Sequence, residues 1–399
     1  MPAASHHGRL IATSQSRLIA TINGCMFVFG LMLLLMGSLL PSLQLSNARA
    51  GSLGSFPLLG ILAATVLIGP ILDKVGAKAS LGVALVLIIA ALTAIPSLRD
   101  FSALAAAALV YGLGAGVLNA ATNTLISTLS ATGRGSALNL LGFSFSLGAL
   151  LVPLLMSLTA GRFSPAAVLY SLAAVSALVL VLVLVLVQRF PPPAHASTPL
   201  GSLLRVLNQP VVWLFAGILF FESCSENCMF VWAGKIVQEA LRLSVSRADI
   251  ALLGLSAAMG VGRLAASRTL KSVGSRNTIL AATGLIAAGA VLVLFSGGFT
   301  AMVAGFFVIG LGLAAVYPTV LGMAGDRFPS ETGTVFGAII AVSLVGGTAG
   351  PLIGSWAAAA GPKAVLAVPL AAAAAVAALT LRVTRRGPSG RATRAVKAA

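Results

Sequence analysis

The sequence predicts an all-α membrane protein, with twelve transmembrane helices in two pseudo-symmetric six-helix bundles around a central cavity. Three observations lead to this fold class. Hydrophobic residues make up 58% of the 399 residues and charged residues only 8%, which is too little charge to cover a soluble protein of this size. Apolar stretches long enough to cross a bilayer recur along the whole chain. Finally, short segments of the first half return in the second half.

Hydropathy, read against turn residues and charges, divides the chain into twelve expected spans. These cover residues 18–40, 54–72, 79–97, 102–126, 137–159, 166–187, 211–235, 250–270, 277–296, 299–323, 333–357 and 364–381. The longest interruption contains three consecutive prolines, Pro191 to Pro193, and is expected to be a linker. We therefore expect a first bundle over residues 1–190, a cytoplasmic linker over 191–210, a second bundle over 211–381 and a basic tail over 382–399.

The internal repeat supports this division. The matching segments are Tyr111-Gly112 with Ile309-Gly310, Leu58-Leu59 with Leu252-Leu253, and Pro153-Leu154 with Pro351-Leu352. Their offset stays between 194 and 198 residues. A steady offset near half of the chain predicts two related six-helix halves.

The distribution of basic residues predicts the orientation. The net charge is +17, but outside the tail the lysines and arginines are scattered singly through short loops, so no nucleic-acid partner is expected. Of the 25 basic residues, 18 fall on the side that holds both termini and 7 on the other. This bias predicts a multi-pass protein of the cell inner (plasma) membrane with both termini in the cytoplasm.

Two glutamates are the main candidate for ion coupling. Glu222 and Glu226 stand four residues apart in an otherwise apolar span, although the chain has only eight acidic residues. A carboxylate at bilayer depth is costly and usually faces a bundle interior or a water-filled cavity. On an ideal helix the two lie about 40° apart, and Ser225, Met229 and Trp232 share their face. This face would provide two acids, a hydroxyl and an aromatic platform.

The glutamate pair leaves the coupling ion open. Two close carboxyls in a low dielectric do not both ionise easily, so one is expected to hold a proton. The same pair would suit Na⁺, which needs oxygen ligands and is attracted by negative charge. The alternative is a structural one, in which a protonated glutamate donates a hydrogen bond between helices.

Cys224 and Cys228 interleave with the two glutamates, which suggests a metal site at first sight. However, a two-residue step turns a helix by about 200°, so the cysteines and the glutamates point to nearly opposite sides. We therefore expect packing cysteines and no metal site, other than Na⁺ at Glu222 and Glu226.

Further polar side chains are candidates for substrate contacts. Asn119 and Asn123 repeat the four-residue spacing in the fourth span, and their amides can bind sugar hydroxyls as donors and acceptors. Interhelical hydrogen bonding is an equal alternative. Ser225 and Trp232 join them from the seventh span, and Tyr317 from the tenth, where aromatics also serve as interfacial anchors.

The loop between the second and third spans carries a recognisable motif. Gly69, Asp73, Lys74, Gly76 and Lys78 resemble the Gly-x-x-x-Asp-Arg-x-Gly-x-Arg loop signature of the major facilitator superfamily. A related loop between the eighth and ninth spans begins at Gly262-Arg263 and lacks the acid. The resemblance implies a twelve-helix transporter with a gating role for these residues and Arg263.

A finer resemblance is to the fucose permease branch, the sugar–proton symporters of the superfamily. It rests on Gly112-Leu-Gly114-Ala-Gly116 with Asn119 and Asn123 in the fourth span, on Glu226 six residues before Trp232, and on Tyr317-Pro318 in the tenth span. Members of that branch carry coupling acids in the first and fourth helices, where this chain has Gly37 and Asn119. Any coupling here must therefore be sought first at Glu222 and Glu226.

These observations together predict a secondary active transporter that couples H⁺ to the symport of a sugar or similar polyhydroxylated solute by alternating access. Nucleophile motifs, a P-loop and a dinucleotide fingerprint are absent from the sequence, so we expect no enzyme and no cofactor. The expected partners are a small-molecule substrate and the lipid bilayer, and the protein is expected to be a monomer. Three alternatives remain: Na⁺-coupled sugar symport, export of amphiphilic compounds, and a non-transporting solute sensor.

Overall fold

The computed structural model describes residues 3–129, 134–159, 162–186, 207–328 and 332–385. Most of the expected linker over 191–210 and most of the expected tail over 382–399 therefore lie outside the described residues.

The described residues contain 12 helices that are long and apolar enough to cross a membrane, and no strand. Their bounds are α1 Ala3–Leu43, α2 Asn47–Val75, α3 Ala77–Ala94, α4 Phe101–Leu129, α5 Arg134–Thr159, α6 Pro165–Leu186, α8 Pro210–Leu241, α9 Val245–Val273, α10 Ser275–Phe295, α11 Phe299–Arg327, α12 Thr332–Ala358 and α13 Ala367–Arg385. Short 3-10 turns, η1 Ile95–Ser97 and η2 Pro362–Leu366, follow α3 and precede α13. The predicted all-α membrane fold is confirmed, with α1 starting well before the expected first span.

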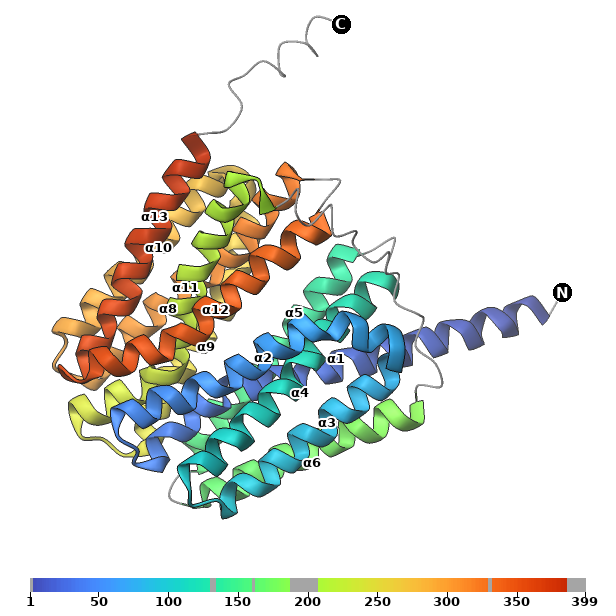
Figure 1. Ribbon diagram of the computed structural model, residues 1–399, viewed down its shortest axis with the longest axis horizontal. Coiled ribbons are helices and arrows are strands. Elements are labelled where there is room, and N and C mark those ends of the chain that lie inside the picture. Colours follow the sequence, from blue (N-terminus) through green and yellow to red (C-terminus); the bar gives the residue numbers. More distant parts are fainter. Residues whose placement is uncertain (1–2, 130–133, 160–161, 187–206, 329–331, 386–399) are drawn as a thin grey trace, which may run out of the picture.

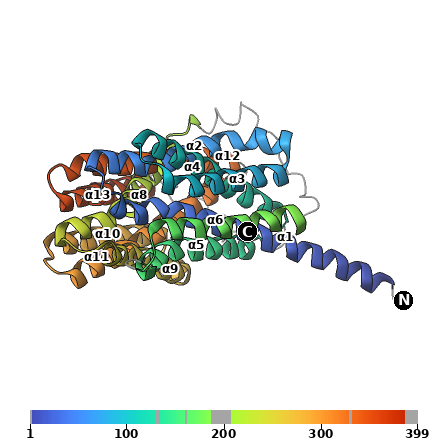
Figure 2. The same cartoon turned by 90° about the horizontal axis from the view of Figure 1, so that it is seen from below.

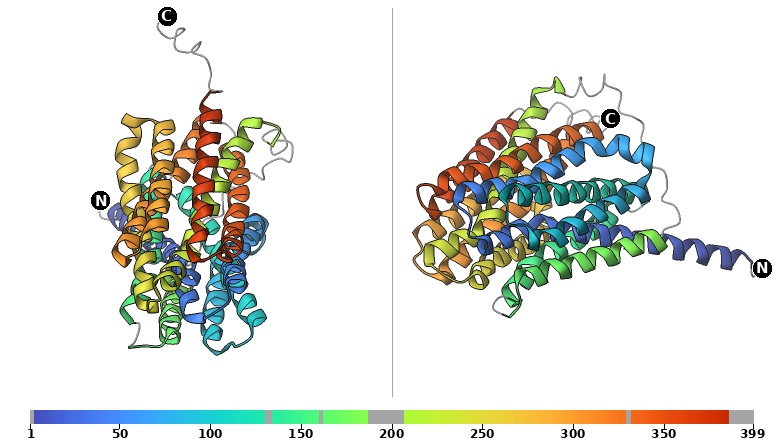
Figure 3. Two further views of the ribbon diagram at one scale, coloured as in Figure 1. Left: turned by 90° about the vertical axis from the view of Figure 1, so that its left-hand side faces the viewer. Right: turned by 60° about the horizontal axis from the view of Figure 1, so that its bottom comes forward.

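The helices pack as two bundles (Figure 1). Within the first bundle, α1 packs on α5, α2 on α4 and α3 on α6; within the second, α8 packs on α12, α9 on α11 and α10 on α13. Two further views show the start of α1 projecting beyond the other helices (Figures 2 and 3).

Both bundles have a glycine with positive φ in the turn between two helices, at equivalent places in the repeat. Gly76, between α2 and α3, has a φ of +82°, and Gly274, between α9 and α10, has a φ of +80°. Glycine adopts this backbone conformation without the steric cost that other residues meet. The two glycines are 198 residues apart, which equals the largest offset found in the sequence repeat. Each turn lies on the side that holds the termini and makes the following helix run antiparallel to the preceding one.

The bundles meet through α2 and α12, α5 and α9, and α1 and α8. They approach each other at one end and diverge toward the end where the termini leave (Figure 1). At the converging end, a Cβ on Gly37 of α1 would collide with the carbonyl oxygen of Phe230 on α8. Helix backbones this close require glycine, because any side chain would force them apart.

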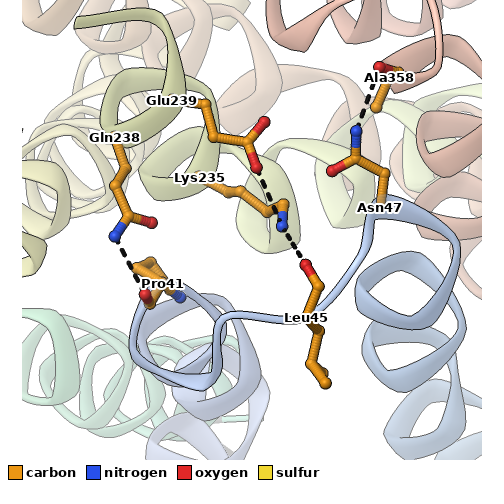
Figure 4. A network of polar contacts seen from close by, with 7 residues as sticks. All are labelled: Pro41, Leu45, Asn47, Lys235, Gln238, Glu239 and Ala358. Carbon is orange, nitrogen blue, oxygen red and sulfur yellow. Dashed lines mark hydrogen bonds and ion pairs between the residues drawn. The ribbon is translucent and has the colours of Figure 1, made fainter. Parts of the chain in front are cut away.

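Polar side chains tie the bundles together at the same converging end (Figure 4). Lys235 Nζ of α8 donates to the carbonyl oxygen of Leu45 at 2.8 Å and lies 3.1 Å from the Glu239 carboxylate. Gln238 Nε2 donates to the carbonyl oxygen of Pro41 at 3.1 Å. Asn47 Nδ2 of α2 donates to the carbonyl oxygen of Ala358, the last residue of α12, at 3.2 Å. We call Lys235, Gln238 and Asn47 the outer latch, because they close the end away from the termini.

Candidate functional site

The glutamate pair lies halfway along α8, between the ends of the membrane-spanning segment. The Glu222 side chain is buried, with its residue only 2% exposed, whereas Glu226 is half-buried. Glu222 Oε2 accepts a hydrogen bond from Ser223 Oγ at 3.3 Å, and its Oε1 has no hydrogen-bond partner. The two carboxyls are close enough to repel each other when both are ionised. Such a pair at this depth is suited to hold a proton or a cation between them.

Two side chains from other helices surround the pair. The Arg263 guanidinium of α9 lies within electrostatic range of both carboxyls. Tyr317 of α11 also interacts with both, and its hydroxyl is next to Ser343 of α12. The structure therefore brings Tyr317 close to the glutamate pair, and its role as a substrate contact stays a prediction.

Arg263 is not in a loop, which corrects the expectation that placed it in the gating loop between the eighth and ninth spans. Residue 263 lies inside α9, ten residues before its end at Val273. The likeness to the superfamily loop signature suggested a loop from Gly262-Arg263 onward, but Gly262 instead allows α9 to pack tightly on Leu311 of α11. The arginine is thereby held at the depth of the glutamate pair.

Arg263 also contacts the first bundle. Its Nη1 donates to Ser146 Oγ of α5 at 3.3 Å, and its guanidinium lies 5.5 Å from the ring centroid of Phe145. These residues line a small pocket between the bundles, to which α1, α5, α8 and α9 all contribute. Its lining residues are Leu34, Phe145, Ser146, Ala149, Phe230, Ser256, Met259, Gly260 and Arg263.

Trp232 and Ser225 of α8, which were expected to share a face with the glutamate pair, are buried in the structure. Trp232 is only 1% exposed, and its Nε1 donates to the carbonyl oxygen of Pro351 on α12 at 3.1 Å. Ser225 is 2% exposed with an unpaired hydroxyl. Both side chains are enclosed in this conformation, and substrate contacts at Trp232 and Ser225 stay a prediction. Trp232 is enclosed because α12 covers the side of α8 that carries it.

The packing of α12 on α8 also determines the surroundings of Cys224 and Cys228. The Cβ of any residue at Gly350 would collide with the backbone carbonyl of Cys224, and Gly354 of α12 leaves just enough room for Cys228 Sγ. Both cysteines thus belong to the contact between α8 and α12. Among the described residues, no three His, Cys, Asp or Glu side chains gather as a metal site.

Asn119 and Asn123 remain candidates in the first bundle. Both are half-buried, and Asn123 Nδ2 donates to the backbone oxygen of Asn119 at 2.8 Å and to its Oδ1 at 3.0 Å. In the part of the chain that the structure describes, no hydrogen bond or ion pair joins them to the glutamate pair. These two bonds use both hydrogens of the Asn123 amide, whereas the Asn119 amide hydrogens make no hydrogen bond within the described residues and remain for a ligand.

The gating-loop residues are partly described. Lys74 is exposed, Gly76 forms the turn, and Lys78 Nζ donates to the carbonyl oxygen of Leu184 on α6 at 2.8 Å. The environments of Gly69 and Asp73 lie outside the described residues, and the gating role stays a prediction.

Three residues near these sites were missed by the sequence reasoning. Ser146 and Phe145 carry no distinctive sequence signal, since serine and phenylalanine are common in membrane helices. Asp249 is completely buried, and both of its carboxyl oxygens lack partners. It lies by Gly234 of α8, close to the outer latch. The sequence could have indicated Asp249, because it is another acid in a largely apolar segment.

Comparisons with known proteins agree with this architecture. A family profile described as Major Facilitator Superfamily matches residues 18–234 and 219–398. An uncharacterized MFS-type transporter from Yersinia pestis is 24% identical over 307 residues, which is 75% of each chain.

Several solved structures share the fold. The nucleoside transporter NupG has a TM-score of 0.75 and 14% identity, covering 93% of this chain and 98% of its own. A D-xylose-proton symporter has a TM-score of 0.75 and 16% identity, covering 94% and 98%. A bacterial homologue of the human lysosomal transporter Spinster, in an inward-facing and unoccupied conformation, has a TM-score of 0.73 and 12% identity, covering 93% and 95%. At these identities the likeness establishes the fold alone.

Proposed function

The chain belongs to the Major Facilitator Superfamily, and from this premise we propose that it is an H⁺-coupled symporter of a sugar or similar polyhydroxylated solute. Glu226 is the main proton carrier and Glu222 its partner. Asn119 and Asn123 provide hydrogen bonds to the solute from the first bundle, and Tyr317 from the second. Transport proceeds by alternating access, in which one bundle rocks against the other.

The observation that carries this proposal is the location of the glutamate pair. Two interacting carboxyls lie at mid-depth on a helix that contacts both bundles. Glu226 is half-buried while Glu222 is almost fully enclosed. Glu226 is the more accessible of the two carboxyls and is therefore the better candidate to take up and release the proton.

The likeness to the fucose permease branch supports a sugar as the solute. One of the solved neighbours is described as a D-xylose-proton symporter, which is a property of that protein. The absence of an acid at Gly37 has a physical reason, because α8 leaves no space for a side chain there. Coupling in this chain therefore relies on the second bundle.

We also propose that both termini are cytoplasmic. Lys74, Lys78 and Arg276 then lie at the cytoplasmic ends of their helices, as the positive-inside rule favours. The outer latch then faces the outside of the cell, and the conformation described is inward-facing.

Uptake into proteoliposomes tests the proposed function. The purified protein is reconstituted, and labelled sugars are offered under an inward H⁺ gradient at zero Na⁺, and separately under an inward Na⁺ gradient at equal pH. We expect accumulation with the H⁺ gradient only. Accumulation with the Na⁺ gradient only would select Na⁺ symport through the same acids, and no sugar flux under either gradient would refute sugar symport.

A further inference from the structure

Arg263 is a cation at mid-depth that has no acidic partner at ion-pair distance among the residues that the structure describes. It is half-buried, and the polar contact it makes among the described residues is with a neutral hydroxyl, Ser146 Oγ at 3.3 Å. A charged side chain in this position is costly, so it usually marks a substrate or ion pathway. Its closest acids, Glu222 and Glu226, influence it only at longer range.

The pocket beside Arg263 is small, so in this conformation it suits a carboxylate group rather than a whole solute. The guanidinium is a planar fork that matches a carboxylate with two parallel hydrogen bonds. Ser146 and Ser256 also line the pocket, but each hydroxyl already donates to a backbone carbonyl of its own helix, that of Gly142 or Leu252, so the guanidinium is the group that would bind an anion. The guanidinium lies 5.5 Å from the centroid of the Phe145 ring, which itself packs on Phe29 with 5.4 Å between ring centroids. The Phe145 ring and the Ser146 hydroxyl thus fix where the guanidinium lies.

Both bundles contribute residues to the pocket, and a transported ligand must also contact both bundles. Phe145 and Ser146 come from the first bundle, and Phe230, Ser256 and Arg263 from the second. Phe230 is one turn of α8 beyond Glu226. A ligand seated on Arg263 would therefore be next to the proton-carrying pair.

We propose that the transported solute carries a carboxylate, as in an aldonate or a uronate, and that Arg263 binds this group. The inference rests on the proposed function and narrows its substrate class from sugars to sugar acids. Asn119 and Asn123 remain available for the hydroxyls of the solute, whereas Arg263 selects for the charge.

Charge balance connects this site to the glutamates. The titratable groups that interact with Arg263 are Glu222 and Glu226 on α8, and Tyr317 on α11 interacts with these two glutamates. The pocket residues of α1 and α5, which are Leu34, Phe145, Ser146 and Ala149, are not titratable. When Glu226 is ionised it attracts the guanidinium and repels a carboxylate. When Glu226 takes up a proton, the guanidinium is left for the solute. Proton and anion therefore enter together, and sugar-acid binding strengthens as the pH falls.

Paired ligands test the inference. The affinities of purified protein for D-gluconate and D-glucose, and for D-galacturonate and D-galactose, are measured by calorimetry. The variants are Arg263→Gln and, as the matched control, Arg268→Gln, which removes an exposed arginine five residues further along α9. We expect each acid to bind the wild type more tightly than its neutral counterpart. Arg263→Gln should weaken acid binding at least about 10-fold, as expected for a charge-assisted hydrogen-bonded pair, while Arg268→Gln should not.

The outcomes separate this inference from the proposed function. Neutral sugars that bind as tightly as the acids, with no effect of Arg263→Gln, would overturn the inference and leave sugar symport in place. Absence of binding by all four ligands would overturn both. If Arg263→Gln does not fold, Arg263→Lys takes its place, because it keeps the charge but lacks the planar fork. Acid affinity equal to wild type in a folded Arg263→Lys protein would also contradict the inference.

Discussion

At the scale of single residues, the indole of Trp232 has a structural role in the conformation described. It is enclosed between α8 and α12 and donates to the Pro351 carbonyl. The sequence placed Trp232 and Glu226 on one helical face, which is correct for an isolated helix. It could not indicate that α12 covers part of that face, because this depends on contacts between segments more than a hundred residues apart.

This assignment gives a prediction for Trp232→Phe. The variant keeps most of the apolar contact but loses one hydrogen bond, which lowers stability by about 0.5–1.5 kcal/mol. Thermal unfolding in detergent should show a lower melting temperature, while calorimetry shows unchanged ligand affinity. A large loss of ligand affinity without a loss of stability would show that Trp232 contacts the substrate.

A second residue-scale prediction concerns Asp249. Its two carboxyl oxygens are buried and unpaired, and an unsatisfied buried polar group costs about 1–3 kcal/mol. Asp249→Leu has a similar size and no polar atoms, so it should raise the melting temperature of the conformation described. Asp249→Asn serves as the control, because its amide stays unpaired in the same place. A lower melting temperature for the leucine variant than for the asparagine variant would show that Asp249 has a partner that this conformation does not contain.

At the scale of helices, the sequence predicted the spans and their number because apolar length is a local property. It also placed Gly76 in the loop between the second and third spans, where the structure has a turn whose positive φ favours glycine. It did not predict the outer latch, since the acceptors on Pro41, Leu45 and Ala358 are backbone carbonyls that every residue possesses. Nor did it predict the depth of Arg263, which follows from the extension of α9 to Val273.

The outer latch gives an element-scale prediction. Lys235→Ala combined with Gln238→Ala removes two hydrogen bonds between the bundles, worth about 1 kcal/mol each. The closed outer end should lose population by roughly 10-fold or more relative to the open one. Spin labels on the exposed residues Gln44 and Ser244 would report this as a longer distance between the two loops. Arg242→Ala is the control, since Arg242 is exposed at the same end of α8, and a distance distribution like that of the control would contradict the latch.

Gly37→Ala gives another prediction at this scale. The added methyl group would collide with the Phe230 carbonyl, so α1 and α8 must separate and the outer end cannot close fully. Substrate uptake should fall strongly. Gly284→Ala is the control, because a Cβ there meets nothing within 4 Å, and alanine is favoured over glycine inside a helix. Equal uptake by both variants would show that closure does not need this contact.

At the scale of the whole molecule, two bundles are closed by the outer latch at one end and carry a carboxyl pair and an arginine between them. The repeat in the sequence predicted the two bundles, and the position of Glu222 and Glu226 within an apolar span predicted where to look for coupling. Which ion and which solute the site takes depends on side chains from four or more helices, and such combinations have no pattern along the chain.

The central claim is that Glu226 carries the coupled proton, and uptake and exchange measured on the same proteoliposomes test it most directly. Exchange of labelled for unlabelled solute needs alternating access but no net proton movement, whereas accumulation driven by an H⁺ gradient needs both. We predict that Glu226→Gln abolishes gradient-driven accumulation and retains exchange, with D-gluconate and D-galactose as the offered solutes. Gradient-driven accumulation by Glu226→Gln at the wild-type level would contradict the account.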